Sequence, residues 1–206
     1  MVSLTEGERA GTFIATKEHR RFVEFATAVR RHRTIGLCFG PAGVGKTLSA
    51  RRYAHWDEAE PMIEGWGLSV DACKALEEKL AGTRTAFYTP TITGTLRDLR
   101  DTMGQSLVLV SACIEAQIKR EGGKVLRRDQ NRMVELIIID EAERMQTAAL
   151  ELVRDIFDRT SRGVILIGMP GMEKRLARYP QLYSRVGFAH HYRSLTGDEL
   201  SFVLTR

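Results

Sequence analysis

The sequence is poor in cysteine and has no long uninterrupted apolar run. Its 206 residues include three cysteines, Cys38, Cys73 and Cys113, which lie far apart and match neither a C-x-x-C pair nor a metal-ligand spacing. This usage favours buried thiols in a reducing compartment. No apolar run is long enough to cross a bilayer, and residues 1–11 lack a secretory-signal pattern. We therefore expect a cytoplasmic protein with no membrane partner.

The chain also lacks internal repeats, low-complexity tracts and any linker long enough to mark a second domain. Hydrophobic residues make up 43% of the sequence, which is enough for a sizeable core and argues against global disorder. The length is typical of one domain with a small appendage. A net charge of +5 permits a polyanionic partner but does not require one.

One glycine-rich stretch fits the phosphate-binding pattern G-x-x-x-x-G-K-[ST], known as Walker A. Residues 35–39 before it predict a strand, and residues 48–54 after it predict a helix. In such a loop, backbone N–H groups converge on phosphate oxygens and the helix N-terminus adds positive potential. Lys46 is expected to reach the terminal phosphates, and the Thr47 hydroxyl to hold Mg²⁺. The predicted nucleotide-binding residues are Gly40, Pro41, Ala42, Gly43, Val44, Gly45, Lys46 and Thr47.

Two adjacent carboxylates, Asp140 and Glu141, follow a second apolar run. Residues 136–139 are Leu-Ile-Ile-Ile, which is typical of a central parallel strand covered on both faces. Ligands bind at the carboxyl ends of such strands. Asp140 is expected to hold Mg²⁺ through water, and Glu141 to polarise the attacking water as general base. An acidic helix cap would give the same pair, but together with the upstream loop Glu141 favours ATP hydrolysis.

The rest of the chain alternates between helical and strand patterns. Strands that are apolar on both faces, separated by helices, predict an α/β protein with a three-layer sandwich around a parallel sheet. Residues 57–64 are acidic and predict a loop, and residues 91–95 predict a turn with a helix cap. Further helices are predicted at 17–32, 70–80, 96–119, 146–159, 172–178 and 198–206, and further strands at 85–89, 163–168 and 188–192.

Basic residues gather in two regions. The polar face of helix 17–32 is interpreted as a solvated surface, although contact with phosphates or a neighbouring subunit would use the same charges. The glycine-containing segment after residue 118 is the most concentrated positive charge, and both solvation and phosphate-backbone binding remain open there. The candidate DNA contacts are, first, Lys119, Arg120, Lys124, Arg127 and Arg128, and second, Arg97 and Arg100.

Further motifs in the sequence resemble those of one protein family. The two anchors are followed by Leu-Ile-Gly-Met-Pro at 166–170 and Tyr-Pro-Gln-Leu-Tyr-Ser-Arg-Val-Gly-Phe at 179–188. Over residues 12–204 this order resembles the AAA+ ATPases of transposition, such as the phage Mu B, TniB and TnsC proteins and the IS21 helper ATPase. The resemblance implies a P-loop NTPase fold with a central parallel five-stranded sheet. It divides the chain into an N-terminal helical extension (1–33), an AAA+ core (34–193) and the start of a minimal or truncated helical lid (194–206).

The resemblance also implies a function. Its members bind ATP and Mg²⁺, form a helical filament or ring of their own copies on double-stranded DNA, select target sites, and recruit or stimulate a transposase. Arg185 resembles the arginine finger that reaches a neighbour's γ-phosphate, so the implied catalytic residues are Lys46, Asp140, Glu141 and Arg185. Thr89 stands where such proteins often place a polar partner for the glutamate. Met169 replaces a polar sensor, which implies slow, regulatory hydrolysis.

Two other functions use the same core. A helicase-loader-like ATPase would act chiefly on a protein partner. A freestanding nucleotide hydrolase would work as a monomer and would need no finger from a second subunit.

Overall fold

A parallel five-stranded sheet lies at the centre of the structure, a computed structural model that describes residues 13–63, 70–126 and 133–205. The strand order is β2-β3-β4-β1-β5, and every neighbouring pair is parallel. This confirms the predicted α/β fold with a five-stranded sheet. The strands are β1 (Ile35–Phe39), β2 (Thr85–Tyr88), β3 (Leu136–Ile139), β4 (Gly163–Gly168) and β5 (Val186–His191).

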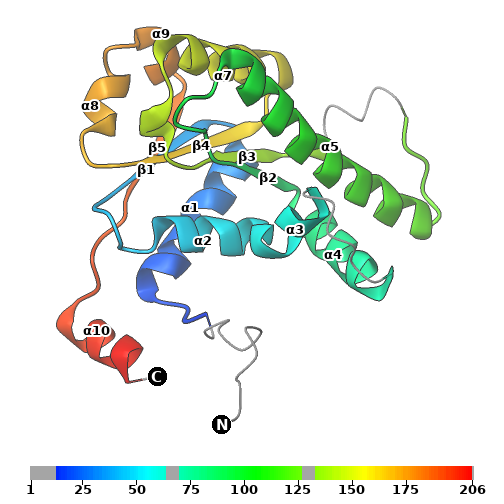
Figure 1. Cartoon of the computed structure of the whole chain (residues 1–206), viewed down its shortest axis with the longest axis horizontal. Coiled ribbons are helices and arrows are strands. Elements are labelled where there is room, and N and C mark those ends of the chain that lie inside the picture. Colours follow the sequence, from blue (N-terminus) through cyan, green and yellow to red (C-terminus); the bar gives the residue numbers. More distant parts are fainter. Residues whose placement is uncertain (1–12, 64–69, 127–132, 206) are drawn as a thin grey trace.

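Helices cover both faces of the sheet (Figure 1). The first four helices form one layer, and the helices that follow β3 and β4 form the other. The long α5 runs along the β2 side of the sheet and packs against α4. The helical elements are α1 (Lys17–His32), α2 (Lys46–Ala54), α3 (Trp56–Ile63), α4 (Val70–Thr83), α5 (Leu96–Arg120), the 3₁₀ turn η3 (Ala142–Arg144), α7 (Thr147–Thr160), α8 (Met172–Leu176), α9 (Pro180–Tyr183) and α10 (Gly197–Leu204).

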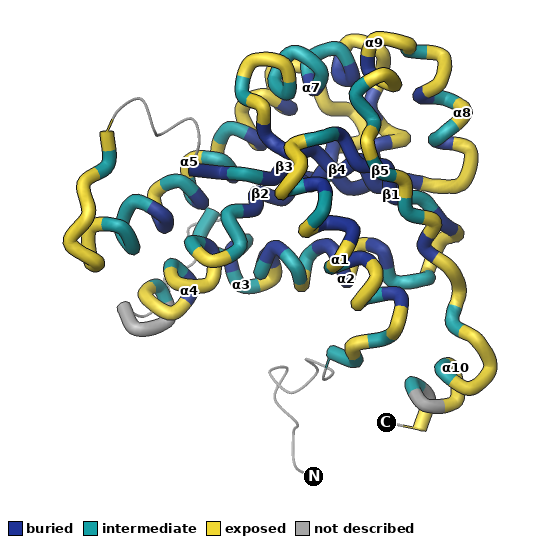
Figure 2. Tube along the Cα trace, turned by 180° about the vertical axis from the view of Figure 1, so that it is seen from behind, coloured by how far each residue is buried: buried dark blue, intermediate teal, exposed yellow. Residues whose placement is uncertain are grey.

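The apolar strands divide their side chains between two core clusters. Leu136 and Ile138 of β3 pack into the cluster beneath α1 to α4, whereas Ile137 and Ile139 pack into the cluster beneath α7 to α9. Consecutive strand residues point to opposite faces, so an unbroken apolar run is needed where both faces are covered. Burial is concentrated in the strands and the inner sides of the helices, whereas α10 and the segment leading to it are mostly exposed (Figure 2).

The predicted loop at 57–64 is wrong, because residues 56–63 form helix α3. Its acidic residues pair with Arg51 of α2, with Glu60 Oε2 lying 2.5 Å from Arg51 Nη2. Trp56 is 5% exposed and anchors the helix in the core. A negative first turn also suits a helix N-terminus. The charge that suggested a loop therefore belongs to the solvent face of an amphipathic helix.

Other boundaries differ by a few residues. Helix α4 continues through Gly82 to Thr83, and β5 begins at Val186 rather than Phe188. The predicted cap of α5 is confirmed, since Thr95 Oγ1 accepts from the backbone of Asp98 at 3.2 Å and Asp98 Oδ2 accepts from the backbone of Thr95 at 2.7 Å. Among the helices within the described ranges, none is both long enough and apolar enough to cross a membrane.

Helix α1 rests directly on β1 at Gly36. A Cβ atom added there would lie 2.4 Å from Val29 Cγ2 and 2.8 Å from Phe25 Cζ. Gly36→Ala is therefore expected to lower the free energy of unfolding by about 1–3 kcal/mol through overpacking. Urea denaturation followed by circular dichroism measures the change.

Gly104 of α5 is the matched control. A Cβ atom added there meets no described heavy atom within 4 Å, and alanine favours a helix interior. Gly104→Ala is expected to raise the free energy of unfolding by about 0.5–1 kcal/mol. Equal effects of the two substitutions would contradict the close contact of α1 with β1.

Candidate nucleotide-binding site

The Walker A loop connects β1 to α2 at the carboxyl edge of the sheet. Gly43 and Gly45 have φ angles of +74° and +99°, a region that favours glycine. A Cβ atom at Gly40 would lie 2.2 Å from the carbonyl oxygen of Tyr192, so this position also requires glycine. Gly45 is the N-cap of α2 and offers no capping side chain. The first amides of α2 are therefore available to an anion.

Lys46 and Thr47 occupy the first turn of α2. The Lys46 ammonium is buried and donates to the carbonyl oxygens of Gly40 at 2.7 Å and Pro41 at 2.6 Å. These bonds draw the carbonyl groups of the loop toward the lysine. The side chain of Thr47 is exposed on the same turn. This arrangement suits a phosphate-binding loop, in which N–H groups and an ammonium converge on one position.

Asp140 and Glu141 follow β3 at the same edge. Asp140 is 3% exposed, and its Oδ1 accepts the backbone N–H of Glu141 at 2.9 Å. Glu141 has a φ angle of +48°, the left-handed region that costs a non-glycine residue about 1 kcal/mol or more. Such strain often occurs at functional sites, which supports the role predicted for this glutamate.

The loop and the carboxylates face each other across the end of β4. One strand separates β1 from β3 in the sheet, so their ends are about 10 Å apart. The thiol of Cys38 in β1 is close enough to Lys46 and Asp140 to be affected by both charges. Burial raises the pKa of this thiol to about 12, while Lys46 acts to lower it and Asp140 to raise it. Thr47 and Asp140 together offer the hard oxygen donors that Mg²⁺ takes alongside nucleotide phosphates. The residues present therefore fit a Mg²⁺-nucleotide.

The carboxylate of Glu141 forms an ion pair with Arg144 of η3. Arg144 Nη1 also donates to the carbonyl oxygen of Pro90, just after β2, at 3.0 Å. Thr89 was the predicted polar partner of the glutamate, whereas the ion pair in the structure comes from Arg144. The three-residue spacing between Glu141 and Arg144 is the signal that could have indicated this pair once a helical turn was expected.

A second arginine contacts the backbone of η3 and of the residue that follows it. Arg175 of α8 donates to the carbonyl oxygen of Glu143 at 2.7 Å and also to that of Met145. No local pattern indicates this contact, because β4 separates the two segments along the chain. The guanidinium of Arg175 thus holds the backbone that follows the two carboxylates, whereas the guanidinium of Arg144 links the Glu141 carboxylate to the carbonyl oxygen of Pro90.

Arg185 lies at the opposite edge of the sheet. Its carbonyl oxygen accepts the N–H of Ile35, the first residue of β1, at 3.0 Å. The length of β1, about 16 Å, therefore separates Arg185 from the Walker A loop of its own chain. Its guanidinium makes a two-pronged pair with Asp158 of α7, at 2.5 Å and 2.8 Å, and holds the pKa of Asp158 below its usual range. Arg185 therefore lies too far from the Walker A loop of its own chain to contact a nucleotide bound there.

A model of the AAA domain family matches residues 29–176. The chain belongs to the AAA domain family. It is also 38% identical, over 199 residues, to a potential ATP-binding protein of Staphylococcus aureus, covering 93% of this chain and 71% of that relative.

Among solved structures, the Aeropyrum pernix Orc1 protein in complex with DNA is 18% identical, with a TM-score of 0.41, and matches 91% of this chain and 47% of that one. PCH-2 of C. elegans is 15% identical, with a TM-score of 0.36, and matches 86% of this chain and 42% of that one. The match thus covers less than half of either solved chain.

Tyr192, just after β5, contacts the end of the Walker A loop and the start of α2 in this AAA domain. Its hydroxyl bonds to Ser49 Oγ of α2 at 2.7 Å and to the side chain of Thr16 before α1. His19 Nδ1 lies 3.1 Å from the same Ser49 oxygen. A Cβ atom at Gly45 would lie 3.5 Å from the Tyr192 hydroxyl. The loop, α1 and the end of the sheet therefore meet at one hydrogen-bonded cluster.

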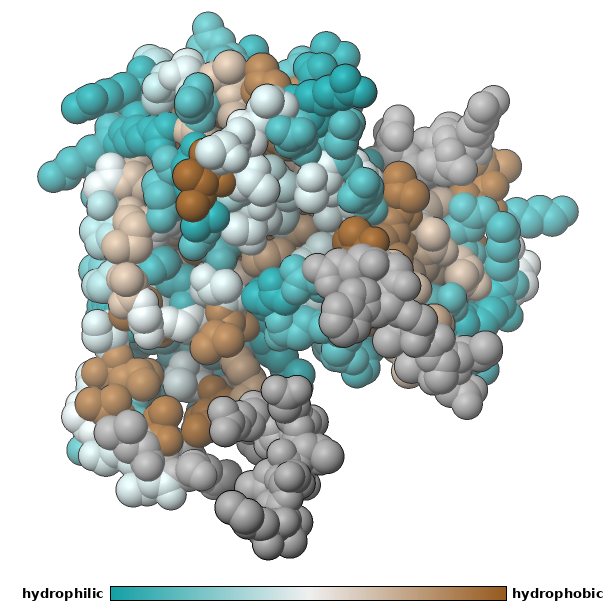
Figure 3. All heavy atoms as spheres, in the orientation of Figure 1, coloured by the Kyte–Doolittle hydropathy of each residue, from teal (hydrophilic) through white to brown (hydrophobic). Residues whose placement is uncertain are grey.

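A groove of about 210 Å³ adjoins this cluster, between the segment before α1 and helix α10. Apolar atoms gather on the surface around α10 (Figure 3). Thr16, which contacts Tyr192, is part of the wall of this groove. Its lining residues are Ile14, Ala15, Thr16, Lys17, Arg20, Asp198, Glu199 and Val203.

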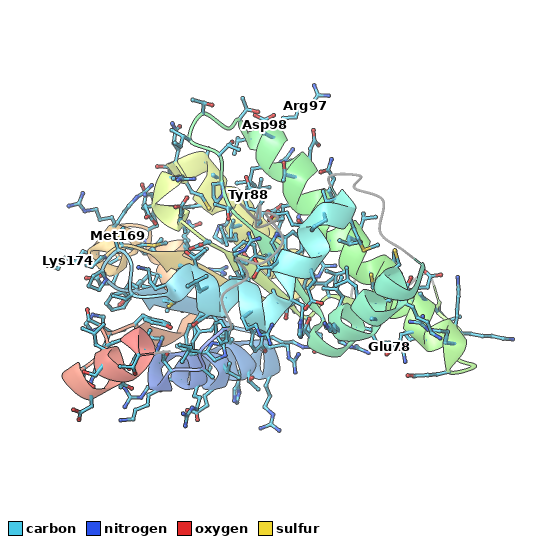
Figure 4. The ribbon with its side chains drawn as sticks, turned by 60° about the horizontal axis from the view of Figure 1, so that its bottom comes forward. Glu78, Tyr88, Arg97, Asp98, Met169 and Lys174 are labelled. Carbon is cyan, nitrogen blue, oxygen red and sulfur yellow. The ribbon has the colours of Figure 1, made fainter. Side chains whose placement is uncertain are left out.

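The candidate DNA contacts of the AAA domain lie at both ends of α5. Arg97 extends from the first turn away from the body of the protein, with 89% of its side chain exposed (Figure 4). It forms an exposed pair with Asp101 of the same helix at 3.6 Å. Arg100 is exposed one turn later. The 25 residues of α5 span about 37 Å, so the structure does not gather the candidates into one patch.

The candidates at the far end of α5 are partly neutralised. Lys119 pairs with Glu115 at 2.7 Å, and Arg120 pairs with Glu77 of α4 at 2.8 Å. Lys124 is exposed. Arg127 and Arg128 lie outside the described residues.

The Tyr192 cluster yields a direct test. Tyr192→Phe removes a buried hydroxyl with two partners, so we expect the free energy of unfolding to fall by about 1–2 kcal/mol and nucleotide affinity to fall with it. Tyr183→Phe is the control, because Tyr183 is 48% exposed, and its effect should stay within about 0.5 kcal/mol. Denaturant titration and binding of a fluorescent ATP analogue measure both quantities. Indistinguishable variants would contradict the supporting role of the cluster.

Proposed function

We propose that this AAA domain is an ATP-dependent DNA-binding regulator of transposition. In this proposal it assembles on double-stranded DNA, selects target sites, and recruits or stimulates a transposase. The observation that carries the proposal is the division of the candidate ATPase residues between opposite edges of the sheet. Lys46, Asp140 and Glu141 lie at one edge and Arg185 at the other, so a complete site needs two copies of the chain.

The nucleotide chemistry follows from the residues at the carboxyl edge. The first amides of α2 bind phosphate oxygens, and Lys46 exchanges its loop carbonyls for the terminal phosphate. Thr47 and Asp140 hold Mg²⁺, which neutralises charge on the phosphates. Glu141 accepts a proton from the attacking water. The groove beside α10 receives the nucleoside end of ATP, and the name of the Staphylococcus aureus relative supports ATP as the ligand.

Hydrolysis is proposed to be slow and to depend on assembly. Met169, which follows β4 and is 39% exposed at the carboxyl edge, has no polar group with which to hold water. Arg185 exchanges Asp158 for the γ-phosphate of a neighbouring copy, which preserves its charge pairing. In this proposal, hydrolysis therefore depends on contact between two copies of the chain.

We assign DNA binding to Arg97 and Arg100 in preference to the basic residues at the far end of α5. They follow β2 and lie at the same edge as the nucleotide, whereas Lys119, Arg120 and Lys124 are remote from it. Contacts of this kind go to phosphates and carry little sequence information. The assignment to transposition rests on the motifs at 166–170 and 179–188.

The proposal predicts ATP-dependent and salt-sensitive binding to duplex DNA. With a slowly hydrolysed ATP analogue, the protein should form filaments or rings on duplex DNA in electron micrographs. The double variant Arg97→Ala/Arg100→Ala should lower the slope of log affinity against log salt by about two, one for each phosphate contact. Lys79→Ala removes an exposed cation of α4 that is paired with Glu58 of α3, and it should leave the slope unchanged.

Three other results would contradict this function. Absence of duplex binding at low salt would remove it. A stoichiometric complex with a hexameric helicase and no filaments on DNA would favour the helicase loader. Full ATPase activity of Arg185→Ala would favour a monomeric hydrolase.

Glu141→Gln separates binding from hydrolysis. The amide cannot act as a base, so turnover should fall about 10²–10⁴-fold while ATP binding is retained. The variant should also stay on DNA longer than the unaltered protein after ATP is added. Lys46→Ala should lose ATP binding itself. Phosphate release and calorimetric titration measure the two effects, and wild-type turnover by Glu141→Gln would rule out its role as base.

A further inference from the structure

We propose that the pocket beside the loop after β2 binds a small apolar carboxylate. The pocket lies between the loop of residues 90–95, the first turns of α5 and the start of α7. Its volume is about 140 Å³, close to that of an engineered protein cavity of roughly 150 Å³ that takes up benzene. The Walker A residues do not line it, so a ligand here is additional to the nucleotide.

The start of α7 presents backbone donors to this pocket. Gln146 is the N-cap of the helix, its side chain makes no capping hydrogen bond, and the first turn contains no acidic residue. The first N–H groups of a helix have no partner within it, and the helix dipole favours an anion beside them. The N–H of Ala149 is already bonded to the carbonyl oxygen of Gln146. The N–H groups of Thr147 and Ala148 therefore remain for a ligand.

A buried hydroxyl also lines the pocket. Tyr88, the last residue of β2, is 5% exposed and lies in the body of the molecule, below the start of α5 (Figure 4). Its hydroxyl forms no hydrogen bond with any residue that the structure describes. Burial, and then the charge of Asp98, raise the pKa of Tyr88, so the hydroxyl keeps its proton. A buried hydroxyl without a partner is costly, and a ligand oxygen would satisfy it.

The remaining walls of the pocket are mostly apolar. Leu99 and Met145 are 5% and 2% exposed and belong to the same core cluster as Tyr88. Leu96, in the first turn of α5, adds a half-exposed apolar side chain. Surfaces of this kind take up the hydrocarbon part of a ligand and release water. A carboxylate on a short branched hydrocarbon therefore fits the pocket better than inorganic phosphate, which has no apolar part.

The charged groups around the pocket already have partners. Arg144 forms part of the wall and is paired with Glu141. Asp98 Oδ2 accepts from the backbone N–H and from the hydroxyl of Thr95, both at 2.7 Å. Asp98 is also exposed, so solvent and salt screen its charge. The attraction for a carboxylate therefore comes from the first amides of α7 and from the hydroxyl of Tyr88.

Titration of the nucleotide-free full chain with isovalerate, followed by NMR of the backbone amides, tests the site. We expect saturable shifts of the Thr147 and Ala148 signals, with a dissociation constant in the millimolar range or below. Isovaleramide has the same shape without the charge and should bind about tenfold more weakly, because hydrogen bonds to a charged group are stronger. The absence of saturable shifts up to about 20 mM isovalerate, or equal affinity for the amide, overturns the proposal.

Two variants locate the ligand in this pocket. Tyr88→Phe should lower isovalerate affinity about five- to twentyfold with an unchanged melting temperature, because the hydroxyl has no partner within the described residues. Ala148→Glu places a carboxylate in the first turn of α7, so it should abolish binding without loss of stability. Unchanged affinity in either variant overturns the assignment.

Ala148→Gln is the uncharged control for Ala148→Glu. Its side chain has the same length but carries no charge, so it should retain more affinity for isovalerate. An equal loss of affinity in the two variants would show that the added side chain excludes the ligand by size. That result would contradict recognition of the carboxylate by the amides of α7.

The same titration distinguishes two sources of the carboxylate. N-acetyl-leucine mimics the C-terminal residue of a polypeptide, whereas isovalerate represents a free acid. Tighter binding of N-acetyl-leucine supports the end of a partner chain as the ligand, and tighter binding of isovalerate supports a free acid. Failure of both to bind overturns the site, whereas the proposed function is decided separately by DNA binding and ATP hydrolysis.

Discussion

The parallel arrangement of the five strands is the constraint on which the rest of the structure depends. All five strands end at the same edge. The Walker A loop after β1 and the carboxylates after β3 therefore lie near each other, although they are far apart in the sequence. The same geometry sends each returning helix to the opposite edge. Arg185 follows such a helix and precedes β5, which is why it faces away from the nucleotide loop of its own chain.

Three charged side chains central to the proposed chemistry are already paired within the chain. Lys46 donates to loop carbonyls, Glu141 is bound to Arg144, and Arg185 is bound to Asp158. Burial or half-burial of an unpaired charge is costly, so a chain without nucleotide needs internal partners for them. Nucleotide, water and a neighbouring copy would replace those partners one by one. The proposed reaction is therefore a set of exchanges among charged groups, in which few new groups need to be ordered.

The sequence predicted the parts of the structure in which a local pattern and the global fold agree. The loop at Gly40 to Thr47 and the strand before Asp140 have strong local signals, and both appear where they were expected. Helix α3 was missed because its acidic residues are compensated by Arg51, a contact across two elements that no local pattern records. The contact of Arg144 with Pro90 and the contacts of Arg175 were missed for the same reason, since both arginines donate to backbone carbonyl oxygens whose positions depend on the fold. The roles of the site residues remain predictions.

The central claim is that one ATPase site is completed by two copies of the chain, and mixing two inactive variants tests it most directly. Glu141→Gln lacks the base in every copy but keeps Arg185, whereas Arg185→Ala lacks the finger but keeps Glu141. The account predicts that each variant alone is nearly inactive in the presence of duplex DNA, and that an equimolar mixture hydrolyses ATP well above the sum of the two. A mixture no more active than its parts, or an Arg185→Ala protein that turns over ATP as fast as the unaltered chain, would contradict the claim.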